Sequence, residues 1–207
     1  EMVKEACEGL EETNPQQILE EAKKNLYDGV SEEDARTSLV MTSRTLVEQE
    51  PNYTYVTARI LLDNIRTEAL TYLGMQKQAT QKEMESLYPE ALRNFLAKGV
   101  ENEILNPELL EMDVDKLGQA IISSRDNDFT YLGLQTLYDR YFIHHDEVRY
   151  ELPQVFFMRV SMGLALRENE REERAIEFYN LLSSFDYMSS TPTLFNSGTK
   201  HSQLSSC

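Results

Sequence analysis

Cysteine and histidine are both scarce in this sequence. Its 207 residues include two cysteines, at positions 7 and 207, and three histidines. Two cysteines so far apart provide neither a disulfide framework nor the ligand spacing of a zinc site. A low cysteine content is typical of proteins in a reducing cytoplasm, so we expect a cytoplasmic protein that holds no metal of its own.

Basic residues are also few. The sequence has 20 Lys and Arg against 36 Asp and Glu, which gives a net charge of −16. An acidic surface of this kind repels nucleic acid and anionic membranes, so we expect neither as a partner. The sequence has no basic leader followed by an apolar core and no apolar run of about 18 residues, which argues against a signal peptide and a membrane span.

The first 75 residues predict short helices packed as a bundle. Asn14-Pro15 combines a cap with a proline at the first helical position, and residues 31–34 resemble a capping box. A longer helix follows Pro51 and ends near Gly74. Apolar residues recur at helical spacing in all three segments: Ile18, Leu19, Ala22 and Leu26; Ala35, Leu39 and Leu46; Val56, Ile60, Ile65, Ala69 and Leu73. Three such stripes predict a small helix bundle.

Further helices are predicted between residues 84 and 187. Asn106-Pro107 marks one helix start, and Asp128 is a candidate cap for another. Residues 155–166 are apolar almost all round, which predicts a helix buried in a larger domain. The paired charges Arg125 and Asp126 can serve a ligand or a dimer contact, but local structure at a helix start is the favoured interpretation.

The string His144-His145-Asp146-Glu147 predicts the turn of a short hairpin, flanked by residues 141–143 and 148–152. Its composition raises the question of a metal site. Adjacent residues on a turn point in different directions, and no further histidine follows before His201. We therefore do not expect metal binding here.

The composition changes at the end of the sequence. Residues 189–199 are rich in small hydroxyl side chains, with one proline and one glycine, and the chain runs on to Cys207. Small residues let the backbone approach a ligand closely, and hydroxyl and amide groups donate to phosphate oxygens. A thiol can act as a nucleophile or a redox partner. The same composition is typical of ordinary loops, so the residues alone leave both interpretations open.

Two segments of this tail carry a resemblance. Residues 190–199, Ser-Thr-Pro-Thr-Leu-Phe-Asn-Ser-Gly-Thr, and 203–207, Gln-Leu-Ser-Ser-Cys, resemble the entry to the catalytic barrel of the class I ribonucleotide reductase large (alpha) subunit. Residues 125–131 resemble a helix-start pattern of the same family. The resemblance implies that Thr193 lies at the substrate diphosphate and Ser206 near the substrate. It also implies that Cys207 is one of two thiols that reduce the ribose and become a disulfide.

The N-terminal helices resemble the ATP-cone, a regulatory nucleotide-binding module of many such reductases. The resemblance rests on residues 7–10, 27–30 and 51–60. The module's opening hairpin, which carries phosphate contacts, is missing, and Thr67 stands where a functional cone has a basic residue. Glu32 and Glu33 crowd a helix start expected near the nucleotide, where their charge opposes phosphate. ATP and dATP with Mg are the effectors that the resemblance implies, but we expect a degenerate cone that packs rather than binds.

The expected fold class is mainly α. We expect an incomplete ATP-cone-like helix bundle over residues 1–77 and a helical N-terminal domain over 78–187. Residues 188–207 are expected to start a truncated α/β catalytic barrel with its first strand, as an extended segment. Glu1 opens without a cap and Cys207 has no polar tail after it, so we expect a piece of a longer protein that is inactive by itself.

The resemblance implies an enzyme that reduces ribonucleoside diphosphates to deoxyribonucleoside diphosphates by thiyl-radical chemistry. It implies a small (beta) subunit whose di-metal centre generates the radical, thioredoxin or glutaredoxin as reductant, and a homodimer of large subunits. The alternatives are a helical regulatory or interaction module without a catalytic role, and a relative of the glycyl-radical or adenosylcobalamin reductases. The tail favours a reductase, and residues 125–131 favour class I.

Overall fold

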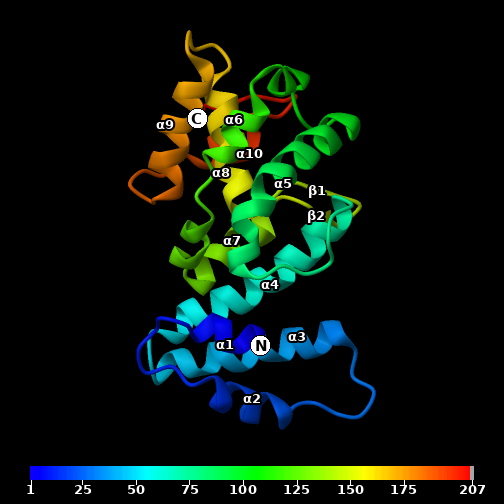
Figure 1. The fold of residues 1–207 in the computed structure, drawn as a ribbon, viewed down its shortest axis with the longest axis vertical. Helices are drawn as coiled ribbons and strands as arrows, with labels where there is room; N and C mark the ends of the chain where they lie inside the picture. Colours follow the sequence, from blue (N-terminus) through cyan, green and yellow to red (C-terminus); the bar gives the residue numbers. More distant parts are fainter. Residues whose placement is uncertain (206–207) are drawn as a thin grey trace.

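The computed structural model describes residues 1–205, and the chain is mainly α-helical, as predicted (Figure 1). The helices are α1 (Met2–Cys7), α2 (Pro15–Lys23), α3 (Glu32–Thr45), α4 (Tyr53–Tyr72), α5 (Gln81–Glu101), α6 (Val114–Gln119), α7 (Tyr131–Arg140), α8 (Pro153–Ala165), α9 (Arg171–Ser183) and α10 (Thr191–Asn196). Short 3-10 turns are η1 (Leu46–Glu48), η2 (Pro107–Glu111) and η3 (Ser123–Asp128). Strands β1 (His144–His145) and β2 (Val148–Arg149) form an antiparallel hairpin. No helix in residues 1–205 is long and apolar enough to cross a membrane.

The N-terminal helices begin where their caps predict. The Asn14 side chain accepts hydrogen bonds from the amides of Gln16 and Gln17, and Pro15 occupies the first turn of α2. The Ser31 side chain accepts from the amide of Asp34 at the start of α3. Helices α1 to α4 then pack together at the lower end of the molecule (Figure 1).

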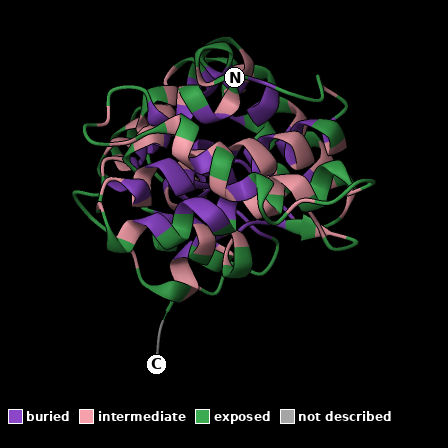
Figure 2. Cartoon of the chain, turned by 90° about the horizontal axis from the view of Figure 1, so that it is seen from below, coloured by how far each residue is buried: buried purple, intermediate pink, exposed green. Residues whose placement is uncertain are grey.

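Helix α4 belongs to both ends of the molecule. It packs against α1 and α3 on one side and against α7, η3 and β2 on the other. Its buried residues join one continuous apolar core that extends from Val3 to Leu194. Figure 2 shows the buried residues running through the middle of the molecule. The predicted boundary between residues 77 and 78 stays a prediction.

Helix α8 is the buried centre of the C-terminal half. All of its residues from Pro153 to Met162 are buried, which confirms the prediction from its apolar composition. It packs most extensively against α9 and also contacts α5 and α10. Helix α8 is therefore the support on which the C-terminal segment lies.

Two local predictions are wrong. Helix α7 is capped by Thr130, whose hydroxyl accepts from the amide of Gly133, and Asp128 instead ends η3. In the hairpin, the two histidines pair with residues 148–149, so the turn is only Asp146-Glu147. Both turn residues have positive φ, 48° and 65°, as a tight two-residue hairpin turn requires.

The tail also differs from its prediction. Residues Thr191–Asn196 form α10 where an extended segment was expected. Ser190 stands at the cap position and Pro192 lies in the first turn, where a missing amide hydrogen and a fixed φ favour a helix. Beyond α10, Thr199 makes an isolated antiparallel bridge to Leu105, the one β-type pairing that the structure shows in residues 188–205.

Candidate functional site

Thr193 lies in the first turn of α10 and is half-buried. Its hydroxyl is 3.1 Å from the Ser190 hydroxyl and donates to the carbonyl of Leu204 at 3.3 Å. The Asn196 side-chain amide donates to the carbonyl of Gln203 at 2.8 Å. The chain thus turns back after α10 and brings residues 203–204 alongside Thr193. Ser206 and Cys207, the other two predicted site residues, lie outside the described residues.

A buried ion pair lies beneath α10. Arg159 of α8 donates from Nε and Nη2 to the two carboxylate oxygens of Glu151, at 2.9 and 3.1 Å. Its Nη1 donates to the carbonyls of Leu194 and Ser197 at 3.0 and 2.8 Å. Both charged side chains have no exposed surface. One guanidinium therefore connects the end of α10 to a carboxylate of the core.

The backbone that follows α10 lies directly on α8. The Ser197 hydroxyl donates to the carbonyl of Val160 at 2.6 Å. A Cβ at Gly163 would collide with the amide nitrogen of Gly198, so only glycine allows this approach. Gly198 itself has a φ of 78°, in the left-handed region that favours glycine. These contacts fix the direction in which the chain leaves α10.

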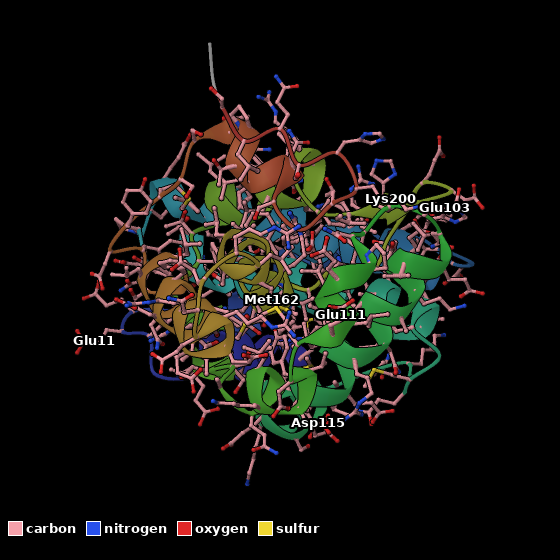
Figure 3. The ribbon with its side chains drawn as sticks, turned by 90° about the horizontal axis from the view of Figure 1, so that it is seen from above. Glu11, Glu103, Glu111, Asp115, Met162 and Lys200 are labelled. Atoms are coloured by element: carbon pink, nitrogen blue, oxygen red, sulfur yellow. The ribbon has the colours of Figure 1, made fainter. Side chains whose placement is uncertain are left out.

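Two side contacts complete the support of the tail. The ring of Tyr141 stacks on Phe195 with centroids 4.6 Å apart, and its hydroxyl is 3.2 Å from the Thr191 hydroxyl. Further along, Lys200 Nζ lies 3.4 Å from a carboxylate oxygen of Glu103, and the two residues lie side by side in Figure 3. The tail is therefore held both at α10 and at Lys200.

These supporting residues were not predicted from the sequence. Arg159 is the one charged residue in the mostly apolar run of residues 152–166. An arginine in a helix predicted to be buried requires a buried partner, because an unpaired charge is costly in the core. That signal was available, whereas the identity of the partner, Glu151, depends on how the chain folds back before α8.

A groove lies between α3, α4 and α7. Its volume is about 710 Å³, and Glu32, Glu33 and Thr67 all line it. The structure thus brings together the three residues on which the degenerate-cone interpretation depends. Arg36 also lines this groove, but it is paired with Glu32 and with Asp63. Its positive charge is therefore already neutralised.

Arg125 and Asp126 make structural contacts with distant elements rather than the local contacts at a helix start that the sequence favoured. Arg125 donates to Asn180 and Ser183 of α9, at 3.0 and 2.6 Å. Asp126 is fully buried and pairs with Arg66 of α4 at 3.1 Å. Burial raises the pKa of the Asp126 carboxyl, and the charge of Arg66 opposes that rise.

The histidine string has no clustered ligands. The ring of His145 faces the hydroxyl of Tyr72 at 3.2 Å, and its Nδ1 lies 3.4 Å from Asp146. In residues 1–205 the structure shows no group of three or more His, Cys, Asp or Glu placed to hold a metal ion.

Comparison with known proteins identifies the family. Residues 127–202 match the family described as the all-alpha domain of ribonucleotide reductase. The chain is 44% identical over 204 residues to the ribonucleoside-diphosphate reductase subunit alpha of Chlamydia muridarum. The aligned region covers 98% of this chain and 19% of that protein. It is 32% identical over 206 residues to the subunit alpha of Helicobacter pylori, covering 99% and 24%. It is 32% identical over 209 residues to the large subunit of Danio rerio, covering 99% and 25%. The chain therefore belongs to the family of the ribonucleotide reductase large subunit, and it spans about a fifth to a quarter of the length of these relatives.

Proposed function

We propose that this chain acts as part of a ribonucleoside-diphosphate reductase large subunit, which forms deoxyribonucleoside diphosphates for DNA synthesis. Thr193 contacts the substrate diphosphate, Ser206 lies near the substrate, and Cys207 is one of the two thiols that reduce it. The names of the relatives support the activity. The observation that carries the site is Thr193 itself, half-buried in α10 and hydrogen-bonded to Leu204, which comes two residues before Ser206 in the sequence.

In this proposal a thiyl radical abstracts the 3′ hydrogen of the ribose, and the 2′ hydroxyl leaves as water. Cys207 and a partner thiol supply two electrons and two protons and become a disulfide. Thioredoxin or glutaredoxin, as an external dithiol, reduces that disulfide by exchange. The radical comes from a small subunit that holds a di-metal centre. A homodimer of large subunits in the cytoplasm belongs to the same proposal.

The partner thiol and the radical cysteine come from residues beyond this chain. Cys7, the other cysteine present, is buried in α1 within the N-terminal bundle, and burial raises its pKa. A protonated, buried thiol is a poor nucleophile and a poor redox partner. We therefore expect residues 1–207 alone to have no reductase activity.

The N-terminal bundle is proposed to pack rather than to bind nucleotide. The groove between α3, α4 and α7 carries Glu32 and Glu33 at the start of α3, where a helix would otherwise favour phosphate. Its Arg36 is held by two carboxylates. ATP and dATP with Mg are consequently proposed not to bind this groove.

The second candidate is a regulatory or interaction module without catalysis. It is favoured by the predominantly helical structure and the acidic surface. A module of that kind needs no Thr193 and no Cys207. Substitutions at these two positions should therefore impair reductase activity under the first function and have no such effect under the second.

Substitutions in the large subunit that carries this sequence, assayed with its small subunit, test the proposal. Cys207→Ser is expected to abolish turnover, and Thr193→Ala to raise KM for the ribonucleoside diphosphate about ten-fold, the loss of a contact worth about 1.4 kcal/mol. Cys7→Ser and Thr136→Ala are matched controls, since Thr136 is exposed on α7. Full activity of the Cys207→Ser variant would overturn the proposal and favour the interaction module.

A further inference from the structure

The short helix α10 has few means of holding its own position. It has six residues, and so short a helix is unstable by itself because few hydrogen bonds offset the cost of nucleation. Its last carbonyls have no partners within the helix. The position of Thr193, one turn before that end, therefore depends on what binds these carbonyls.

Arg159 binds them. One nitrogen, Nη1, reaches the carbonyls of Leu194, Phe195 and Ser197 at 3.0, 3.4 and 2.8 Å. The positive charge also lies at the negative end of the helix, which is its favourable position. Arg159 lies in the buried part of α8, residues Pro153–Met162, so its contacts fix α10 relative to the core.

Glu151 orients the guanidinium. Its two oxygens take the Nε and Nη2 donors, which leaves Nη1 directed at α10. Oε2 of the same carboxylate accepts from the amide of Ile143 at 2.9 Å. A planar guanidinium can serve a carboxylate and a set of carbonyls simultaneously, whereas a lysine ammonium cannot.

We propose that Arg159, oriented by Glu151, is a positioning residue for substrate binding: it holds α10 so that Thr193 meets the diphosphate. This inference rests on the function proposed above. Arg159 does not touch the substrate. It acts only through the backbone of α10.

The test is a double-mutant cycle in the large subunit, assayed with its small subunit. Arg159→Lys is expected to raise KM for the ribonucleoside diphosphate about ten-fold, with kcat changed less than about two-fold, as expected for loss of a binding contact. In a Thr193→Ala background, Arg159→Lys is expected to raise KM no further, because the contact through which it acts is already gone.

Arg66→Lys is the matched control. Arg66 is also a buried arginine paired with a buried carboxylate, Asp126, but it contacts α5 and η3 rather than α10. We expect this variant to lower the melting temperature and to leave KM unchanged. A purely structural role for Arg159 would give the same pattern as Arg66, lower stability without a KM effect.

The outcomes separate the two proposals. If Thr193→Ala leaves KM unchanged, the proposed diphosphate contact is wrong. If Thr193→Ala raises KM but Arg159→Lys does not, or if the two effects multiply in the double variant, the positioning role is wrong. If Arg159→Lys does not fold, Glu151→Gln, which keeps the side-chain shape, takes its place in the cycle. Failure of both variants to fold would show that the pair serves folding alone and would overturn the inference.

Discussion

The hydroxyl of Tyr88 donates a 2.7 Å hydrogen bond to the carboxylate of Asp126, and both side chains are fully buried. The same carboxylate accepts from Arg66 at 3.1 Å and from the side-chain amide of Gln154 at 2.9 Å. The Tyr179 hydroxyl in turn donates to Gln154 at 2.7 Å. One carboxylate in η3 thereby connects α4, α5, α8 and α9, the helices of both ends of the molecule.

The first prediction concerns the stability that this network supplies. Asp126→Ala leaves the Arg66 charge buried without its partner, so we expect the free energy of unfolding to fall by about 3–5 kcal/mol. Tyr88→Phe removes one hydrogen bond to a charged group and should cost about 1–3 kcal/mol. Urea unfolding followed by circular dichroism measures both.

Asp115→Ala is the control for these variants. Asp115 pairs with Arg93 at the surface, where solvent screens the interaction, so its loss should leave the unfolding midpoint nearly unchanged. Equal effects of Asp126→Ala and Asp115→Ala would contradict a structural role for the buried carboxylate.

The second prediction is a pH dependence. Burial raises the pKa of Asp126 above its unfolded value of about 4. Between these two values the folded state binds more protons than the unfolded state, so this carboxyl's contribution to stability is full below about pH 4 and declines as the pH rises through the folded pKa. The amide of Asp126→Asn does not titrate, so this variant lacks the pH-dependent contribution of the carboxyl to stability. The stability of the wild type relative to Asp126→Asn should therefore fall as the pH is raised from 4 towards neutrality, which urea titrations at several pH values measure. A difference that grows over this range would contradict the raised pKa.

Local signals explain which elements were predictable from the sequence. The starts of α2 and α3 depend on caps within three residues of the helix, and α8 depends on composition alone, so all three were predicted correctly. Helix α10 was missed because a serine followed by Thr-Pro suits either a loop or a first helical turn. The helix is favoured over a loop by the contact of its carbonyls with Arg159, a residue far away in the sequence.

The site was predictable only in part for the same reason. Thr193 was identified by its resemblance to a family segment, without any knowledge of its neighbours. Its support comes from Glu151, just before α8, and from Arg159 and Gly163 within α8, and nothing in their local sequence shows that α10 lies against them. Asp128 was predicted as the cap of α7, but η3 extends to Asp128, so the helix starts later with Thr130 at the cap position.

The third prediction concerns the close approach of α8 and the tail. Gly163→Ala places a methyl group against the backbone amide of Gly198 and the hydroxyl of Ser197, so the turn after α10 must move. Overpacking of this kind typically costs about 1–3 kcal/mol. We expect the variant to have a lower melting temperature than the wild type. We also expect its amide hydrogen exchange to increase more in residues 191–199 than in the rest of the chain. Gly133→Ala in α7 is the control, because its nearest neighbour is a threonine hydroxyl at 3.2 Å. Unchanged exchange in residues 191–199 would contradict the close contact.

The fourth prediction concerns nucleotide binding by the N-terminal bundle. Phosphate groups entering the groove between α3, α4 and α7 would meet Glu32 and Glu33, while Arg36 is already paired with carboxylates. Each approach of like charges is unfavourable, and apart from Arg36 the only basic residue among residues 1–205 that lines this groove is Lys77. Isothermal titration of the chain with ATP or dATP in the presence of magnesium should therefore show no saturable heat.

Saturable binding in that titration would contradict the prediction, and two variants then locate the ligand. Arg36→Ala removes the groove's arginine, whereas Arg167→Ala removes an exposed arginine that pairs with Glu108 on the opposite part of the chain. Loss of the heat in the first variant alone would place the nucleotide in the groove. It would mean that Arg36 exchanges its carboxylate partners for phosphate, because a guanidinium binds both groups with the same paired donors.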